Sequence, residues 1–350
     1  MEVDVARRQW FGGLTALIVL GGVLVPATAA GALDRSQARY EPMNSPAEAQ
    51  MQPATQLGAS GRSAPRTCFP KPNRYNRTQS CSVRDETLKL TIGGHELGRF
   101  TYRITQTTAL SVKSTKFTEH VNFRVLAVRG DIESPRLTFG SRCKSPCRAG
   151  ISFPQNRVLR RGTSLTGTVS YSVKTGKGKI YKLWNNYSWT FRGTNVPAAT
   201  LRTRSVTYRC DNALNTQGAG CVYPGYIPVM TAMKKLPQIA ANIRRVQSRG
   251  NHYGRPGSGR PLHRMMDRKK QVSNRRAVCR RAVVGPPPRP GVSCDEYPFA
   301  STAEGGTALS RTDRGTAWVP VAEQDSQRGL ITGSHTSQRV LDGDPFYVGV

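Results

Sequence analysis

Acidic side chains near the end of the chain have the types and spacing needed for acid–base or metal chemistry. Asp295 and Glu296 follow a cysteine directly, and Glu304 stands just ahead of two glycines. Between residues 221 and 350 there are 9 acidic residues, and all but one of them come after residue 294. Carboxylates bind hard divalent cations and transfer protons, whereas arginine and lysine bind phosphates. The alternative is that these acids pair with surplus arginines at the surface.

The acidic residues lie in a strongly basic chain. The 350 residues contain 52 Lys and Arg against 21 Asp and Glu, which gives a net charge of +31. Residues 234–289 alone hold 16 Lys and Arg and the single acid Asp267. This balance argues against an acidic cytosolic enzyme and indicates a polyanionic partner such as nucleic acid, anionic lipid or wall polymer. A solvated surface that keeps the protein soluble is the alternative for the basic residues before position 221.

The first 32 residues have the pattern of a secretory signal peptide. Arg7 and Arg8 precede an apolar stretch from Trp10 to Val25, which is followed by small residues. The stretch is short for a bilayer span, so an uncleaved anchor is the less favoured interpretation. No later stretch approaches the roughly 18 apolar residues of a transmembrane helix. We therefore expect a secreted, extracellular protein with no stable membrane association after signal cleavage.

Cysteine usage agrees with export. All eight cysteines come after the predicted signal, and an even number in an oxidising compartment favours disulfides. No pair has the two-residue spacing typical of zinc ligands, which disfavours a zinc site. The pairing is left open by the sequence. The disulfide candidates are Cys68, Cys81, Cys143, Cys147, Cys210, Cys221, Cys279 and Cys294.

The chain divides by composition into further segments. Residues 33–66 are rich in Ala, Ser, Pro and Gln and predict a disordered leader or propeptide. Residues 67–210 predict an all-β sandwich or barrel of unknown role, because short runs with near-alternating apolar residues are separated by turn signals such as Gly93-Gly94. The predicted strands are 88–92, 99–104, 120–128, 165–173 and 179–191.

The pattern changes after Cys221. Apolar residues recur at three- and four-residue spacing from Leu236 to Val246, with Pro237 suited to a first helical turn and Gly250 to the residue after a helix. This predicts an amphipathic helix whose other face is basic. A stiff proline-rich connector over 286–290 then leads to the acidic block.

Several motifs after residue 221 resemble one known family. They are the segment Leu236-Pro237-Gln238-Ile239-Ala240-Ala241-Asn242-Ile243, the Arg289-Pro290-Gly291 approach, the CDEYPFAS block from Cys294, Glu304-Gly305-Gly306, Glu323-Gln324-x-x-Gln327 and the closing 341–348. On these motifs, residues 221–350 resemble the secreted bacterial deoxyribonucleases of the NucA/NucB type. The resemblance implies a small α+β nuclease domain of the ββα-metal type, and the predicted all-β part, which lies outside the resemblance, makes the protein multi-domain.

The resemblance also implies roles for individual residues. Asp295 would be the base that activates water in place of the histidine of most ββα-metal nucleases, and Glu304 would be a second catalytic residue or metal ligand. Gln324 or Asp325 would help to bind Mg²⁺ or Mn²⁺ as the cofactor, and the sequence does not decide between the two. Both are oxygen donors suited to hard cations.

Three arginines and one disulfide complete the predicted site, whereas the histidine at position 335 is not expected to belong to it. Arg280, Arg281 and Arg289 are expected to bind DNA phosphates, and a Cys279–Cys294 bridge would clamp the strand that presents the aspartate. His335 is expected to be a surface group, since it is a lone histidine near a Gly-Ser turn.

The function expected from these features is a secreted metal-dependent endonuclease. It would be a phosphodiesterase that hydrolyses DNA through backbone contacts with little sequence specificity. No protein partner is expected. The alternative is a non-catalytic secreted basic protein that binds extracellular DNA or cell-wall polyanions. Arg328, which stands where the family pattern has glycine, keeps that alternative open.

Overall fold

The computed structural model describes residues 37–43, 52–53, 68, 73–215 and 217–350. The predicted signal peptide lies outside the described residues, as does most of the predicted leader. None of the helices formed by the described residues is long and apolar enough to cross a bilayer.

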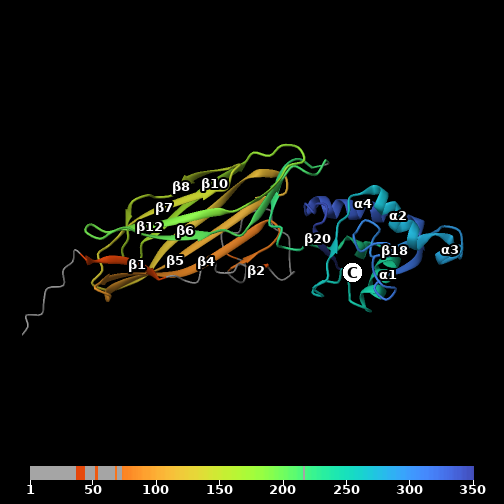
Figure 1. Cartoon of the computed structure of the whole chain (residues 1–350), viewed down its shortest axis with the longest axis horizontal. Coiled ribbons are helices and arrows are strands. Elements are labelled where there is room, and N and C mark those ends of the chain that lie inside the picture. The colour runs from red at the N-terminus through yellow and green to blue at the C-terminus, as the bar shows by residue number, and fades with distance from the viewer. Residues whose placement is uncertain (1–36, 44–51, 54–67, 69–72, 216) are drawn as a thin grey trace, which may run out of the picture. The chain divides into compact units, whose positions relative to one another are not determined.

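An eight-stranded sheet dominates the β-rich part (Figure 1). Its strands are β1 (Arg39–Met43), β2 (Gln52–Pro53), β3 (Arg74–Tyr75), β4 (Gln79–Ile92), β5 (His95–Ser111), β6 (Ser114–Gly130), β8 (Cys147–Ser152) and β10 (Ser164–Val173). The order is β2-β3-β4-β5-β6-β10-β8, with β1 paired to β4. Gly93 and Gly94 join β4 to β5 and both have positive φ, as a tight two-residue hairpin turn requires. The turn is where the sequence predicted it.

Strand β1 lies inside the segment that was expected to be a disordered leader. Tyr40 and Ala38 are buried in the core of the β-rich part, and the Tyr40 hydroxyl donates to the carbonyl of Glu133. In this short segment the buried Ala38 and Tyr40 alternate with the exposed Arg39 and Glu41, and the strand pairs with β4, a contact that composition does not reveal.

Two smaller sheets complete the β-rich part. One has the order β13-β12-β7-β9 and the other β11-β14-β15. Their strands are β7 (Arg136–Cys143), β9 (Arg157–Val158), β11 (Ile180–Leu183), β12 (Asn185–Arg192), β13 (Ala199–Arg204), β14 (Tyr208–Asp211) and β15 (Gly220–Val222). Trp189 of β12 packs on Phe123 of β6, with ring centroids 5.9 Å apart. The buried faces of the sheets thus form one aromatic core, in agreement with the predicted β-rich region.

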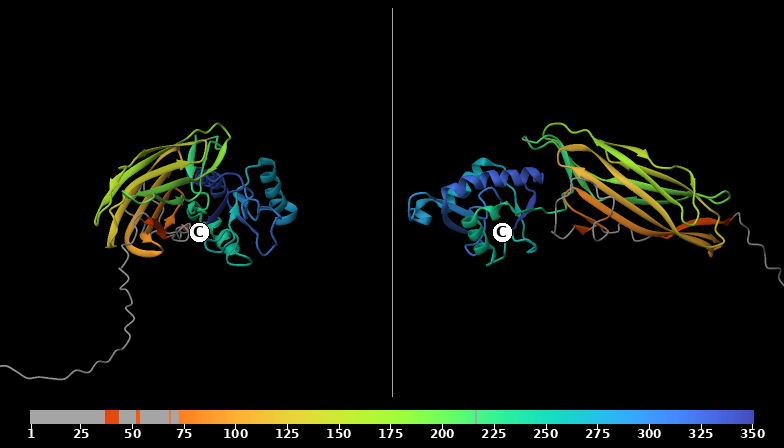
Figure 2. Two further views of the ribbon diagram at one scale, coloured as in Figure 1. Left: turned by 60° about the vertical axis from the view of Figure 1, so that its left-hand side comes forward. Right: turned by 180° about the vertical axis from the view of Figure 1, so that it is seen from behind.

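The C-terminal part is a smaller α+β arrangement with its own core (Figure 2). Its strands are β16 (Val229–Met230), β17 (Leu262–His263), β18 (Val292–Tyr297), β19 (Gly315–Pro320) and β20 (Pro345–Val348). Its helices are η2 (Ala232–Lys235), α1 (Pro237–Gln247), α2 (Arg268–Cys279), α3 (Arg281–Val284) and α4 (Val321–Ser337). Strands β18 and β19 form an antiparallel hairpin, and β20 lies between β16 and β17.

Helix α1 is the amphipathic helix that the sequence predicted. Pro237 occupies its first turn, where no intrahelical N–H is required, and Ile239, Ile243 and Val246 are buried on its inner face. Gly250 follows the helix with a φ of 58°. In α2, the lone acid Asp267 is the N-cap, accepting from the amides of Lys269 and Lys270.

All eight cysteines form disulfides between sequence neighbours. The pairs are Cys68–Cys81, Cys143–Cys147, Cys210–Cys221 and Cys279–Cys294. This agrees with the expectation of disulfides rather than zinc ligands, and four bridges are typical of proteins that fold in an oxidising compartment. The Cys279–Cys294 bridge ties α2 to β18, as predicted.

A buried ion cluster connects distant segments within the compact unit of residues 35–350. Arg339 is fully buried, and its Nη2 donates to Asp211 Oδ1 at 2.7 Å while its Nε donates to Asp211 Oδ2 at 3.0 Å. Arg209 binds Asp211 as well, and its Nη1 reaches Asp344 at 2.7 Å. Because each charge has several partners, the cluster avoids the large cost of an isolated buried ion.

Candidate active site

The β18–β19 hairpin presents two carboxylates on opposite faces. Adjacent residues of a strand point to opposite sides, so Asp295 and Glu296 cannot share one site. Both are buried, with exposed fractions of 0% and 7%. Their surroundings decide which of them is suited to chemistry.

Asp295 lies between two helices that hold its carboxylate by hydrogen bonds. Asn242 of α1 donates from Nδ2 to Oδ2 at 2.8 Å, and Gln327 of α4 donates from Nε2 to Oδ1 at 2.7 Å. The two amides fix the plane of the carboxylate. Each carboxylate oxygen retains a lone pair for a further proton or cation.

Glu323 supplies a second carboxylate on the same side. It lies in the first turn of α4, four residues before Gln327 and hence on the same helix face. Its Oε2 accepts from the amides of Gln238 (3.0 Å) and Ile239 (3.1 Å) at the start of α1. An acid is stabilised at a helix N-terminus, where unpaired N–H groups point outward.

Burial is the main influence on the acidity of Asp295. Loss of solvation raises its pKa to about 6, while the hydrogen bonds from Asn242 and Gln327 act in the opposite direction. Arg275 also lowers the pKa and the negative charge of Glu323 raises it. A carboxylate with a pKa near neutrality is a better proton acceptor than an ordinary aspartate, whose pKa is about 3.9.

The structure distinguishes Gln324 from Asp325. Gln324 is half-buried, its Nε2 donates to Gln327 Oε1 at 2.9 Å, and its own Oε1 is buried with no hydrogen-bond partner among the described residues. Asp325 is exposed on α4. Gln324 is therefore connected to Asp295 through Gln327, and its free amide oxygen needs a partner.

Glu304 lies apart from this group. Its Oε1 is 2.6 Å from Nδ1 of His263, and its Oε2 accepts from the His263 amide at 2.9 Å. Among the described residues, no hydrogen bond or ion pair joins Glu304 to Asp295. The family motif suggested their association, but Glu304 follows the end of β18, where the chain has turned toward β17.

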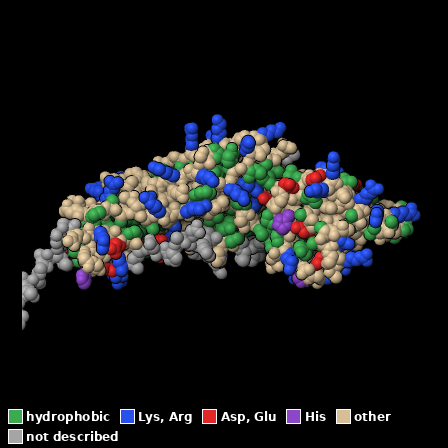
Figure 3. All heavy atoms as spheres, viewed as in Figure 1, with side chains coloured by type: hydrophobic (Ala, Val, Ile, Leu, Met, Phe, Trp, Pro, Cys, Tyr) green, Lys and Arg blue, Asp and Glu red, His purple; other side chains and the backbone are tan. Residues whose placement is uncertain are grey.

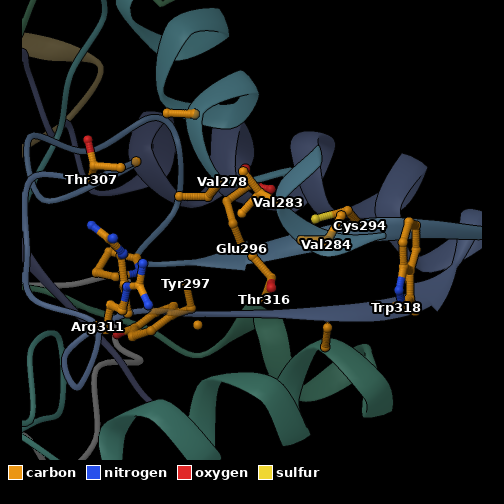
Figure 4. Close-up of a pocket in the computed structure, with 16 residues that line it drawn as sticks. Val278, Val283, Val284, Cys294, Glu296, Tyr297, Thr307, Arg311, Thr316 and Trp318 are labelled. Atoms are coloured by element: carbon orange, nitrogen blue, oxygen red, sulfur yellow. The ribbon is translucent and has the colours of Figure 1, made fainter. Parts of the chain in front are cut away.

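Glu296 faces α2 and is engaged by an arginine. Arg275 Nη1 donates to Glu296 Oε2 at 2.7 Å, and Arg275 Nη2 donates to the carbonyl of Cys294 at 2.6 Å. Figure 4 shows Glu296 at a pocket of about 470 Å³ that also includes Val283, Arg311 and Trp318. Burial raises the pKa of Glu296 to about 7. Together with the disulfide, this contact holds β18 from the side opposite to Asp295.

Other late acids serve the fold, but they do not follow the surface-pairing alternative: only Asp344 of the three below pairs with arginines, and it does so in the buried ion cluster. Asp344 binds Arg209 and Arg77, Asp342 accepts from the amide of Met266, and Asp313 accepts from Asn251. Segregation of acids in the sequence therefore does not by itself mark a site.

The arginines predicted to bind phosphates are exposed but lie near α2 and α3. Arg280 lies between the two helices, Arg281 begins α3, and Arg289 is in the proline-rich connector. The arginine linked to Asp295 is Arg245 of α1, which was not singled out for this role. Its Nη2 donates to Asn242 Oδ1 at 2.6 Å. Asn242 and Gln327 were not singled out as site residues either. Both lie in motifs that carried the family resemblance, so the sequence contained a signal for them.

His335 is buried rather than at the surface, which corrects the expectation from its neighbours in sequence. Its exposed fraction is 3%, and its ring lies edge-on to Phe346 with centroids 4.7 Å apart. Burial, and then the charge of Arg264, lower its pKa to about 3. It is a neutral core group on the inner face of α4.

The donors around Asp295 are suited to a hard cation. The described residues contain no cluster of three or more His, Cys, Asp or Glu side chains able to hold a metal. Two carboxylates and the unpartnered amide oxygen of Gln324 are nevertheless oxygen ligands of the type that Mg²⁺ uses, since Mg²⁺ retains several waters and needs only one or two carboxylates. A zinc site of histidines and cysteines would not fit here.

A buried aspartate with a raised pKa is suited to accept a proton, and a neighbouring carboxylate is suited to bind a divalent cation. Residues 248–349 match the family model described as Deoxyribonuclease NucA/NucB. This match supports a NucA/NucB-family deoxyribonuclease domain at residues 248–349, as the motifs predicted. No curated protein matches the chain. The β-rich part lies outside the family match.

Proposed function

We propose that the protein is a secreted, divalent-metal-dependent endonuclease that hydrolyses DNA phosphodiester bonds with little sequence specificity. The observation that carries this proposal is the buried Asp295, held by amides from α1 and α4 beside Glu323, within a deoxyribonuclease-family domain. Secretion is supported by the four disulfides and by the signal-like N-terminal sequence.

The order of elements supports a ββα-metal arrangement. Strands β18 and β19 form a hairpin, and α4 begins directly after β19 at Val321. The first strand carries Asp295 and the helix carries Glu323 and Gln327. In this arrangement the strand contributes the base and the helix the acidic and amide oxygens.

Asp295 would accept the proton of the attacking water. Its raised pKa makes proton transfer more favourable than for an exposed aspartate. Asn242 and Gln327 would orient the carboxylate and limit its rotation, so that the free lone pair keeps one direction. They act as positioning residues.

Glu323 and Gln324 would hold Mg²⁺ or Mn²⁺ next to Asp295. When bound, such a cation neutralises phosphate charge and lowers the pKa of water. Gln324 is favoured over Asp325 because its buried Oε1 has no other partner among the described residues. Glu304 remains a candidate through the family motif, with its carboxylate held by His263 as that of Glu323 is held by the α1 amides.

Contacts with the DNA backbone would come from the basic surface. Arg245 is exposed and anchored to Asn242, which places a guanidinium near the reacting carboxylate. Arg280, Arg281 and Arg289 are exposed and remain candidates for phosphates further along the DNA. Figure 3 shows Lys and Arg side chains over the β-rich part as well. Binding dominated by phosphates is independent of sequence and weakens steeply with salt.

The proposal predicts that supercoiled plasmid is cleaved in Mg²⁺ or Mn²⁺ and that EDTA abolishes cleavage. Adding excess Mg²⁺ after EDTA should restore it, because the carboxylate site then regains its cation. The measurement is the conversion of supercoiled to nicked and linear plasmid on a gel, with buffer lacking protein as the control. Undiminished cutting in EDTA would contradict the metal requirement. Salt-sensitive retention of DNA without metal-stimulated cutting would favour the non-catalytic alternative.

A further inference from the structure

A second polar pocket lies in the β-rich part, away from the nuclease domain, and its lining includes the exposed residues Gln52, Pro53 and Arg204. Its volume is about 400 Å³, and β4, β5, β6, β12 and β13 all contribute to its lining. Cavities of this size accept small-molecule ligands. The side chains that characterise it are those of Ser82, Arg84, Thr108, Glu119, Tyr187 and Arg204.

Arg84 brings a positive charge into this pocket, and no hydrogen bond or ion pair joins it to a carboxylate among the described residues, although Glu86 and Glu119 act on it at longer range. Its Nη2 donates to Gln106 Oε1 at 2.9 Å and to Thr203 Oγ1 at 3.1 Å, both neutral groups. Its Nε is buried and lacks a partner, and no ion pair to Arg84 exists among the described residues. Burial lowers the pKa of Arg84, while the charges of Glu86 and Glu119 act in the opposite direction. The side chain is half-buried and its Nε is shielded from water, and a shielded guanidinium group is normally paired.

Glu119 makes no direct hydrogen bond or ion pair with Arg84, because its oxygens accept from other side chains. Tyr187 donates to both of its oxygens, at 2.8 and 3.0 Å, and Tyr171 donates to Oε2 at 2.8 Å. Gln106 Nε2 adds a bond to Oε1 at 3.2 Å. Burial raises the pKa of Glu119 to about 7, which reduces its repulsion of an incoming anion at neutral pH.

The other residues that line the pocket indicate which further chemical groups a ligand would carry. Arg204 is exposed on β13 and adds a second guanidinium to the pocket. Ser82, Thr108 and Thr207 contribute hydroxyl groups, which can donate to and accept from hydroxyls of a ligand. We propose that this pocket binds a small hydroxylated compound that carries one anionic oxygen group, with Arg84 as the partner of that group.

Calorimetric titration of the full chain with glucuronate, glucose 6-phosphate and glucose tests this proposal. We expect one or both anionic sugars to bind and glucose to bind at least about tenfold more weakly, because a charge-assisted hydrogen bond contributes about 1.5–3 kcal/mol. The glucuronate and glucose 6-phosphate titrations distinguish a carboxylate from a phosphate as the anionic group. Binding of neither anion, or equal binding of glucose, would overturn the proposal.

Arg84→Gln is the decisive variant, with Arg124→Gln as its matched control. Arg124 is exposed on β6, outside the pocket. Arg84→Gln should weaken anion binding about tenfold or more, whereas the control should bind as the wild type does. If Arg84→Gln does not fold, as judged by circular dichroism, the exposed Arg204→Gln takes its place with the same expected direction. Equal affinity of the folded variant and the wild type would overturn the proposal. Plasmid cleavage should be unchanged in Arg84→Gln, because Arg84 belongs neither to the nuclease domain nor to the exposed basic surface, so this result is independent of the proposed nuclease function.

Discussion

Replacing Asp295 by asparagine should lower kcat/KM for DNA by about 10²–10⁴-fold, the usual contribution of a general base. Asparagine keeps the size of the side chain but has no oxygen that accepts a proton at neutral pH. The amides of Asn242 and Gln327 can rotate to present an oxygen to the new NH₂ group, so the local packing can be retained. The measurement is the rate of plasmid nicking at saturating Mg²⁺.

The melting temperature of Asp295→Asn shows whether the loss of activity is caused by unfolding. The pKa of Asp295 is raised in the folded protein, so its charged form costs stability at any pH above about 6. Asp295→Asn removes that charge and should leave the melting temperature at neutral pH unchanged or higher. Asp325→Asn, on the exposed side of α4, is the matched control and should keep wild-type activity within a few-fold. An active Asp295→Asn enzyme would remove Asp295 from the mechanism.

Replacing Arg339 by methionine should lower the free energy of unfolding by about 3–5 kcal/mol, the usual cost of breaking a buried ion pair. Arg339 donates to both carboxylate oxygens of Asp211 and to the carbonyls of Val112 and Gly218. Methionine has a similar length but no donors, so all of these hydrogen bonds would be lost and the buried carboxylate of Asp211 would lose its main charged partner. Asp211 would retain only Arg209 as a charged partner.

Urea denaturation with the disulfides intact measures this effect. Arg328→Met is the matched control, because Arg328 is exposed on α4 and the change removes the same charge. The control should alter the free energy of unfolding by less than about 0.5 kcal/mol, as surface substitutions usually do. If Arg339→Met were as stable as the control, the buried cluster would contribute no net stability.

The sequence predicted elements whose signals are local. The apolar spacing from Leu236 to Val246 defines α1 because a helix repeats every 3.6 residues regardless of its partners. The Gly93-Gly94 turn was visible because few other residues adopt positive φ twice in succession. Family motifs pointed to the C-terminal nuclease domain.

The sequence did not predict which distant strands pair with each other. The run from Lys179 to Phe191 was predicted as one strand, but the structure divides it at Trp184, since β11 pairs with β14 while β12 pairs with β7 and β13. A local pattern cannot indicate which distant strand each half will meet.

The same limit applied to the candidate site. Strand alternation could place Asp295 and Glu296 on different faces, but not show which face meets α1 and α4. The pairing of Glu304 with His263 depends on the path of the loop after β18, which carries no periodic signal. Asn242 and Arg245 reach the site through helix packing rather than through sequence proximity.

A double-mutant cycle on Asp295 and Glu323 tests the site most directly. Single-turnover rates of plasmid nicking in Mg²⁺ would be compared for the wild type, Asp295→Asn, Glu323→Gln and the double variant. If the two carboxylates serve one reaction step, the double variant should be about as slow as the slower single variant, because groups acting as a unit are not additive. Rates that fall by the product of the two single effects, or a Glu323→Gln enzyme with wild-type activity, would show that Asp295 and Glu323 do not form one active site.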